Sequence, residues 1–351
     1  MTIYALGSNG SGQLGLGHLE DVSKPTLLDV SLGLKATDIK SIVAGGNHTL
    51  ILTYSGDVYA TGSNNGQRCG LDGNTEEYTT LQKVEIPSND RISHCAATWE
   101  ASVLVTADNS VLVCGLGPKG ELGLGQGWTN ASKLHAIHEF PPAGATVVDL
   151  AACMGHVVAV LSNGEVYGWG VGRNGQLGQP YEDVWAPRKL EGVTFKAVRA
   201  VCGKDFTCIF GALKEGEFVL LGPKRDRFSL KASLPARIPE WKDVSASWGS
   251  IYVLLPSGKL LAWGRDDHGQ LPPVDIPPLQ AMRAGSEHVV ALTTSGDVLA
   301  WGWGEHGNCG PETDDRSDVK GRWNVLKLDG EVLFLGGGCA TTWIVTDLGS
   351  G

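Results

Sequence analysis

The chain has 351 residues, a mass of 37.0 kDa and a formal net charge of −10, so it is acidic overall. Hydrophobic residues make up 42% and charged residues 19%, the opposite of the balance found in disordered chains. Glycine contributes 49 residues, about twice its usual share, which is typical of a fold rich in tight turns. The acidic balance argues against wrapping nucleic acid or lying on an anionic membrane, because both need a basic surface.

The N-terminal residues and the cysteines indicate a cytoplasmic or nuclear protein. Residues 1–8 lack the basic and apolar regions of a signal peptide, so we expect no secretion signal. The longest apolar stretch, 146–161, is interrupted by Asp149 and His156 and is too short to cross a bilayer. The eight cysteines are scattered and contain no CxxC pair, as is typical of reduced thiols inside the cell.

In chain order, one pattern recurs from end to end: an apolar strand, a tight turn, a second strand and a glycine-rich loop. Strands before the turn are predicted at 48–53, 101–106, 156–161, 206–211, 250–255, 288–293 and 340–346. Strands after the turn are predicted at 3–8, 57–62, 111–116, 165–170, 217–222, 259–264 and 297–302. These runs are short, apolar and bounded by glycine, which favours strands over helices.

The turn between the two strands carries a residue that tolerates positive φ, as a tight hairpin requires. These positions are Gly56, Asn109, Gly164, Gly216, Gly258 and Gly296. Their spacing runs from 38 residues, between 258 and 296, to 55 residues, between 109 and 164. Such spacing is typical of the blades of a β-propeller.

The two ends of the chain complete the pattern. The strand at 3–8 has no partner before it, and the strand at 340–346 has none after it. Placing the two side by side in one shared blade gives seven blades and closes the ring, which removes exposed sheet edges. We therefore predict an all-β fold: a single domain over 1–351, forming a seven-bladed β-propeller of four-stranded antiparallel blades with few helices.

The loops after the second strand share a glycine-rich signature. It reads GSNGSGQLGLG at 7–17, GSNNGQRCGL at 62–71, GLGPKGELGLG at 115–125, GVGRNGQLG at 170–178, GRDDHGQL at 264–271 and GWGEHGNCG at 302–310. With GGNHT at 45–49 and AGSEH at 284–288, these loops resemble the regulator of chromosome condensation family. The resemblance covers nearly the whole chain and implies a seven-bladed propeller whose ends share a blade.

Within that family, the chain resembles the fungal alpha-tubulin suppressor proteins, also called killer-toxin-insensitivity propellers. The likeness lies in its length, its acidity and its opening IYALGSNGSGQLGLGHLED. It implies a non-enzymatic platform that forms a heterodimer with a small zinc-containing electron-carrier protein. The implied role is in diphthamide synthesis on elongation factor two and in Elongator-dependent modification of wobble uridines in tRNA. We expect no cofactor, no direct nucleic-acid or membrane contact, and a monomer when the partner is absent.

The chain departs from other branches of the wider family. It enters its first predicted strand by residue 3, without the basic tail that the family's founding member uses on chromatin. It shows no long blade insertion of the kind that acts on a small GTPase, and it lacks the Gly-Trp-Arg-His-Thr motifs of the plant ultraviolet sensors. Nucleotide exchange on a small Ran-like GTPase is the alternative function, and a cytoskeletal or ubiquitin-pathway scaffold is a third.

No motif in the sequence predicts an enzyme. His48, His156 and His288 share one repeat position in separate blades, so we expect each to tie a loop to a strand rather than to bind a metal. His135 and His138 have HxxH spacing but no third ligand nearby. The glycine-rich loops lack the Lys-Ser/Thr of a P-loop, and no GxSxG elbow occurs.

The cysteines also follow the repeat. Cys69 and Cys309 replace the Leu of the GQLG signature, and Cys153, Cys202 and Cys339 recur near the start of a strand before the turn. Equivalent positions in different blades should not converge on one ion. We expect these thiols to be small buried apolar side chains.

Tryptophans indicate which face of the propeller binds a partner. Trp169, Trp263 and Trp301 share one repeat position and are predicted to be architectural. Because strand direction alternates, the glycine-rich loops lie on one face, opposite the hairpin turns. The candidate partner-binding tryptophans on or near that loop face are Trp99, Trp128, Trp185, Trp248 and Trp303.

Charged loops complete the candidate site. The segment 222–230 breaks the glycine-rich signature and carries Lys224, Arg225 and Arg227, and such a break marks a candidate functional site. The later loops carry acidic residues and histidines that could orient a small charged partner. These further candidates are Asp266, Asp267, His268, Glu305 and His306.

Overall fold

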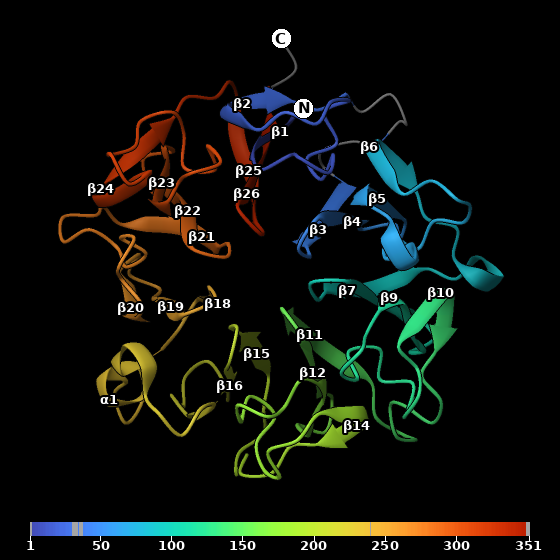
Figure 1. Cartoon of the computed structure of the whole chain (residues 1–351). Helices are drawn as coiled ribbons and strands as arrows, with labels where there is room; N and C mark the ends of the chain where they lie inside the picture. Colours follow the sequence, from blue (N-terminus) through green and yellow to red (C-terminus); the bar gives the residue numbers. More distant parts are fainter. Residues whose placement is uncertain (1, 30–33, 35–37, 239, 349–351) are drawn as a thin grey trace.

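The computed structural model describes residues 2–29, 34, 38–238 and 240–348. Its strands form seven antiparallel sheets that stand around a central axis like the blades of a propeller (Figure 1). We number them blades 1 to 7, beginning with the blade that contains both chain ends. The predicted seven-bladed propeller is confirmed, and the described helical segments are all short.

Blades 1 to 4 each have four strands. Blade 1 contains β1 (Thr2–Gly7), β2 (Val22–Leu27), β25 (Glu331–Gly337) and β26 (Thr341–Asp347). Blade 2 contains β3 (Ile39–Ala44), β4 (His48–Thr53), β5 (Val58–Ser63) and β6 (Glu77–Lys83). Blade 3 contains β7 (Ile92–Ala97), β8 (Ala101–Thr106), β9 (Val111–Leu116) and β10 (Asn130–Ala136). Blade 4 contains β11 (Val147–Cys153), β12 (His156–Leu161), β13 (Val166–Gly170) and β14 (Val184–Lys189).

In blades 2 to 7 the strands follow one another in chain order from the axis outwards, whereas blade 1 runs β25, β26, β1, β2. Blade 5 contains β15 (Arg199–Cys202), β16 (Thr207–Phe210) and β17 (Phe218–Leu221). Blade 6 contains β18 (Asp243–Ala246), β19 (Ser250–Leu254) and β20 (Leu260–Gly264). Blade 7 contains β21 (Leu279–Ala284), β22 (His288–Thr293), β23 (Val298–Trp303) and β24 (Asp318–Leu326). The helical segments are η2 (Asn65–Gln67), η3 (Pro87–Asn89), η4 (Arg227–Ser229) and α1 (Leu230–Ser233).

The two ends of the chain close the ring as predicted. β26 lies between β25 and β1, and it pairs with β1 antiparallel from Thr346 opposite Thr2 to Thr341 opposite Gly7. The hydroxyls of Thr2 and Thr346 also lie 2.7 Å apart. Because the N-terminal strand is held against the C-terminal hairpin in one sheet, the ring cannot open without breaking this ladder.

The hairpin turns have the conformation that the sequence predicts. The five turn glycines have φ between 70° and 94°, and Asn109 has φ of 77°. Asn109 also bridges two blades, since its Nδ2 donates to the carbonyl of Ala145 (2.9 Å) and its Oδ1 accepts from the amide of Val147 (2.9 Å). The side chain explains why an asparagine stands where other copies have glycine.

Blades 5 and 6 differ from the predicted four-stranded pattern, because the described residues of each form three strands. After β17 the chain turns into η4 and α1 instead of an outer strand. The carboxylate of Asp226 stabilises this turn by accepting from the amides of Lys231 and Ala232, both at 2.8 Å. After β20 the proline pairs at 272–273 and 277–278 remove the backbone donors that an outer strand would need.

The core is packed between neighbouring blades. Trp169 and Trp301 are fully buried, as predicted for architectural tryptophans. Trp343 of β26 is buried to nearly the same extent. The indole of Trp169 donates to the carbonyl of Glu121 (3.0 Å), and that of Trp301 donates to the carbonyl of Gln270 (3.2 Å). Trp263 is half-buried against the core shared by blades 5 and 6. None of the described helices is long and apolar enough to span a membrane.

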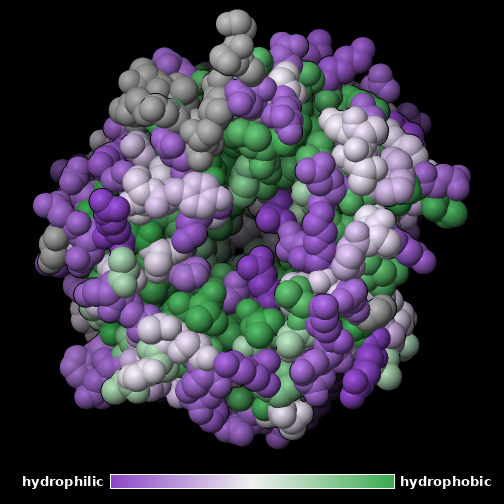
Figure 2. All heavy atoms as spheres, turned by 180° about the vertical axis from the view of Figure 1, so that it is seen from behind, coloured by the Kyte–Doolittle hydropathy of each residue, from purple (hydrophilic) through white to green (hydrophobic). Residues whose placement is uncertain are grey.

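A central channel runs along the propeller axis. Residues of the innermost strands line it, and many of them are alanine or glycine. Two cavities of about 110 and 230 Å³ lie along it and share Ala44, Ala97, Ala152 and Ala246. Seen from behind, the surface is hollowed at the centre of the ring, with hydrophobic and hydrophilic residues mixed around the hollow (Figure 2).

Candidate partner-binding face

The alternating strands give the propeller two distinct faces. On one, which we call the loop face, lie the turns between the first and second strands of each blade and the glycine-rich loops after the third strand. The hairpin turns between the second and third strands lie on the opposite side, the turn face. All the candidate partner-binding residues from the sequence belong to segments at the loop face or to strands that adjoin it.

Two predicted tryptophans meet at the channel mouth on the loop face. Trp99 from blade 3 and Trp248 from blade 6 have ring centroids 5.9 Å apart, and both are half-buried. Their positions are fixed by the backbone, since the amide of Trp99 donates to the carbonyl of Met154 and that of Trp248 to the carbonyl of Ser286. Side chains 149 positions apart in sequence (248 minus 99) therefore form one aromatic pair.

The other predicted tryptophans lie apart from this pair. Trp128 is 41% exposed and packs edge-on against His135, with centroids 5.0 Å apart. Trp185 is half-buried on β14, where its carbonyl accepts a hydrogen bond from Gly125. Trp303 lies at the end of β23, between the rings of two histidines of the candidate site. Apart from the Trp99–Trp248 pair, the predicted tryptophans thus occupy separate places around the loop face.

Two of the five charged candidates in blades 6 and 7 bind neighbouring segments. His268 Nδ1 lies 2.9 Å from a carboxylate oxygen of Asp318. His306 Nδ1 lies 2.7 Å from a carboxylate oxygen of Asp21, which joins blade 7 to blade 1. These pairs give the histidines a structural role in holding the loops together.

The acidic candidates differ in their surroundings. Asp267 receives two hydrogen bonds from Arg265, at 2.6 and 2.7 Å. Asp266 accepts from the amide of Leu271 within its own loop (3.0 Å). Glu305 is exposed on the loop after β23. All three residues are exposed, and Asp266 and Asp267 are engaged within their own loop.

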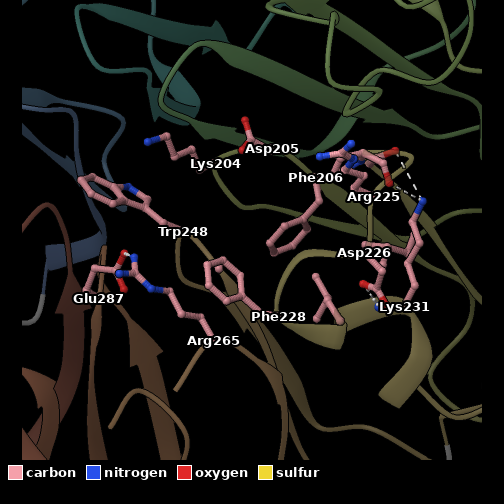
Figure 3. A pocket seen from close by; sticks show the side chains of 15 residues that line it. Lys204, Asp205, Phe206, Arg225, Asp226, Phe228, Lys231, Trp248, Arg265 and Glu287 are labelled. Atoms are coloured by element: carbon pink, nitrogen blue, oxygen red, sulfur yellow. Dashed lines mark hydrogen bonds and ion pairs between the residues drawn. The ribbon is translucent and has the colours of Figure 1, made fainter. Parts of the chain in front are cut away.

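A pocket of about 290 Å³ opens on the loop face where blades 5 and 6 meet (Figure 3). We call it the blade 5–6 pocket. Its walls come from the β15–β16 turn, the segment from β17 to α1, the β18–β19 turn and the start of the loop after β20, and Glu287 of the β21–β22 turn closes it on the side of blade 7. The lining residues labelled in Figure 3 are Lys204, Asp205, Phe206, Arg225, Asp226, Phe228, Lys231, Trp248, Arg265 and Glu287. The pocket thus lies beside the segment where η4 and α1 replace an outer strand.

The pocket contains only part of the predicted cationic site. Arg225 and Trp248 line it, whereas Lys224 lies next to it with its ammonium 4.9 Å from the ring centroid of Tyr181. The side chain of Arg227 lies outside the described part of the chain. Sequence reasoning missed Lys204 and Phe228, although Phe228 stands in the same irregular segment and is 50% exposed.

Arg265 fixes one side of the pocket. Its guanidinium binds Asp267 through Nε and Nη2 and Glu287 through Nη1. Glu287 also accepts from the side-chain amide of Gln270 (2.6 Å). Burial raises the pKa of Glu287, against the opposing effects of Gln270 and Arg265. This network joins blades 6 and 7 and leaves the guanidinium of Arg265 fully engaged.

The repeated histidines connect adjacent blades. His48 Nε2 lies 3.0 Å from the hydroxyl of Ser102, which itself donates to a backbone carbonyl. His156 and His288 repeat this arrangement with Thr207 (3.0 Å) and Thr342 (2.8 Å). Since each hydroxyl uses its proton on the carbonyl, its oxygen accepts the proton of the imidazole Nε2. Burial lowers the pKa to about 3 for His48 and to about 4 for His156 and His288, so all three are neutral.

All eight cysteines are free thiols. Cys153, Cys202 and Cys339 from three blades line the same cavity at the channel mouth, so these repeat-equivalent positions come closer together than the sequence suggests. Even so, the described residues contain no group of three or more His, Cys, Asp or Glu placed to hold a metal ion. Burial raises the pKa of Cys339 to about 11, which keeps this thiol protonated at neutral pH.

Comparison with known proteins identifies the family. The RCC1-like domain matches residues 2–344. The chain is 31% identical to an RCC1 repeat-containing protein of Schizosaccharomyces pombe, covering 98% of this chain and 99% of that protein. It is 30% identical to the secretion-regulating guanine nucleotide exchange factor of Mus musculus, covering 77% of this chain and 61% of that protein.

Solved structures show the same propeller. Human WBSCR16 superposes with a TM-score of 0.82 at 19% identity, covering 99% of this chain and all of that chain. Prp20p of Saccharomyces cerevisiae superposes with a TM-score of 0.81 at 22% identity, covering 98% of this chain and 90% of that chain. These two structures show only that the fold is the same. The family is shown by the RCC1-like domain, which matches nearly the whole sequence. The chain belongs to the RCC1-like family of seven-bladed propellers.

Proposed function

We propose that this propeller is a non-enzymatic platform that forms a heterodimer with a small zinc-containing electron-carrier protein. In this role it supports diphthamide synthesis on elongation factor two and Elongator-dependent modification of wobble uridines in tRNA, in the cytoplasm or the nucleus. The observation that carries the proposal is the loop face at blades 5 and 6, where aromatic and cationic side chains are exposed on an otherwise acidic chain. Aromatic and arginine side chains are the ones that dominate protein interfaces.

The propeller architecture suits this task. Seven sheets hold the loops in fixed relation, so a partner meets a preformed surface and little ordering is needed on binding. The Trp99–Trp248 pair at the channel mouth and the blade 5–6 pocket lie next to each other, because Trp248 belongs to both. A small partner could therefore contact both features in one interface.

Calorimetric titration of the purified chain with the small zinc protein tests the proposal. We expect saturable one-to-one binding of micromolar strength or better, equivalent to about 8 kcal/mol, that weakens as salt is added. Trp248→Ala should weaken it, whereas Tyr54→Ala, which removes a 73% exposed aromatic side chain on the turn face, serves as the matched control. Absence of binding by the correctly folded chain would contradict this assignment.

Nucleotide exchange on a small GTPase is the second candidate. One specific observation favours it: the mouse relative is named as a guanine nucleotide exchange factor, although the match covers 61% of that protein. The test measures release of labelled GDP from a Ran-like GTPase with and without the chain. Acceleration that saturates with the chain would support exchange, and an unchanged release rate would leave the platform function alone.

A further inference from the structure

We propose that the blade 5–6 pocket binds an acidic linear segment of a partner protein. One large apolar side chain of that segment enters between the aromatic walls, and its flanking carboxylates face Lys204 and Arg225. This inference rests on the proposed function of a protein-binding platform and names the chemistry that the site recognises. It does not depend on which protein carries the segment.

The walls of the pocket are built for an apolar side chain. Phe206 and Leu230 are 4% and 6% exposed and form its base, while Phe228 is 50% exposed. Trp248 of the β18–β19 turn also lines the pocket, on the side away from Arg225 (Figure 3). The volume of about 290 Å³ is at the lower limit for small-molecule sites, about 300 Å³. The pocket therefore suits a single large side chain rather than a cofactor.

The charge at the mouth selects an acidic partner. Lys204 and Arg225 are both exposed, and the ammonium of Lys204 lies 5.8 Å from the ring centroid of Trp248. In the described ranges, no carboxylate lies within ion-pair distance of either cation, whereas Arg265 is already bound to two carboxylates. The lining holds four basic residues, Lys204, Arg225, Lys231 and Arg265, against three acidic ones, Asp205, Asp226 and Glu287, so the pocket has a small positive excess on a chain with a net charge of −10. Complementary charge on a partner would steer it to this pocket.

The backbone presents Phe228 to solvent in a strained conformation. Phe228 and Ser229 have φ of 59° and 54°, in the left-handed region that bulky side chains avoid. The Asp226 carboxylate and the buried Leu230 hold the turn on its C-terminal side. The guanidinium of Arg265 lies 5.4 Å from the centroid of the Phe228 ring, so one face of the ring meets blade 6 while half of the side chain stays exposed. A left-handed backbone at a bulky residue is typical of sites that meet a ligand.

The lining also disfavours a compact phosphate group. The carboxylates of Asp205 and Asp226 also line the pocket and would repel a compact anion that carries several charges. A peptide meets less of this repulsion, because its carboxylates are spread along the chain and the side chain that enters the pocket is uncharged. We therefore favour an acidic peptide over a nucleotide or a free phosphate.

Fluorescence polarisation with a labelled synthetic peptide tests the proposal. The probe has one phenylalanine flanked on each side by three aspartates, and the comparison peptides replace phenylalanine with alanine or the aspartates with lysines. We expect saturable binding of the probe that weakens at high salt, and at least about tenfold weaker binding of both comparison peptides. Inorganic pyrophosphate should not compete with the probe.

Variants locate the binding. Phe228→Ala and the double variant Lys204→Glu with Arg225→Glu should each weaken binding of the probe at least about tenfold. The matched controls on the turn face are Leu213→Ala, which is 48% exposed, and Lys259→Glu, which is exposed. They should bind the probe as the unchanged chain does. All altered side chains are exposed, and a thermal melt of each variant verifies that it is folded.

Several results would overturn the inference: no binding of the probe, equal loss in the controls, or competition by pyrophosphate. The same variants titrated with the small zinc protein separate this inference from the proposed function. If the zinc protein binds and the pocket variants alter the affinity for neither the probe nor the zinc protein, the pocket assignment is wrong and the platform function stands. If the probe binds in the pocket but the zinc protein does not bind, the partner is wrong and the pocket assignment stands.

Discussion

Lowering the pH should destabilise this propeller through the three histidines that join adjacent blades. His48, His156 and His288 are neutral in the folded chain because burial lowers their pKa from 6.5 to about 3 or 4. In the unfolded chain they take up protons below about pH 6.5. The unfolded state therefore gains protons first as pH falls, and stability is lost between about pH 6.5 and pH 4.

The structure sets the size of this effect. pH 5 lies about 1.5 units below the unfolded pKa of a histidine, and each pH unit in this range corresponds to about 1.36 kcal/mol per histidine. Each histidine should therefore cost about 2 kcal/mol relative to pH 7, and the three together about 6 kcal/mol. Proton uptake by the folded chain is unfavourable because each Nδ1 is buried without a hydrogen-bond partner. Buried carboxyls with raised pKa, such as Glu287, act in the opposite direction and reduce the net change.

Urea unfolding at pH 7 and pH 5 measures the effect, and histidine variants isolate it. His288→Gln, which can keep a donor toward Thr342, should reduce the pH-dependent loss by about 2 kcal/mol. His138→Gln is the matched control, because the side chain of His138 is 89% exposed. If the loss between pH 7 and pH 5 were the same in the unchanged chain and in a variant lacking all three histidines, the reasoning would be refuted.

Three further predictions concern the ring and its thiols. Trp343→Ala should lower the free energy of unfolding by about 3–5 kcal/mol, because it leaves a cavity at a buried site in the closing strand β26. Trp128→Ala should change this free energy little, and equal urea midpoints for the two variants would contradict the prediction. Asn109→Ala should lower the free energy of unfolding by about 1–3 kcal/mol in the same assay, since it removes two hydrogen bonds to blade 4 and places alanine at a positive φ. Asn109→Gly should lower it less, because glycine adopts a positive φ without strain. Cys339 should react slowly with a thiol reagent at pH 8 in the folded chain and rapidly in denaturant, because burial raises its pKa to about 11 in the folded chain. Fast labelling of the folded chain would contradict this, because it would show an accessible thiolate.

The candidate site was only partly predictable from the sequence. The irregular segment 222–230 and Trp248 stand out because they depart from the repeat, and both contribute to the blade 5–6 pocket. Lys204 and Phe206 give no such signal, since they occupy an ordinary turn of the repeat. Their role depends on how that turn faces the segment after β17, which is a matter of packing between blades. The pairing of Trp99 with Trp248 was hidden for the same reason.

The number of blades, the place of each hairpin and the closure of the ring could all be predicted from the sequence. Each of these follows from local chemistry: apolar runs of strand length, positive-φ residues at the turns and two unmatched strands at the ends. The tertiary structure alone decided which loops meet. The absence of an outer strand in the described parts of blades 5 and 6, and the pocket beside it, depend on contacts between segments distant in sequence. Periodicity describes one blade at a time, whereas a binding site forms where several blades converge.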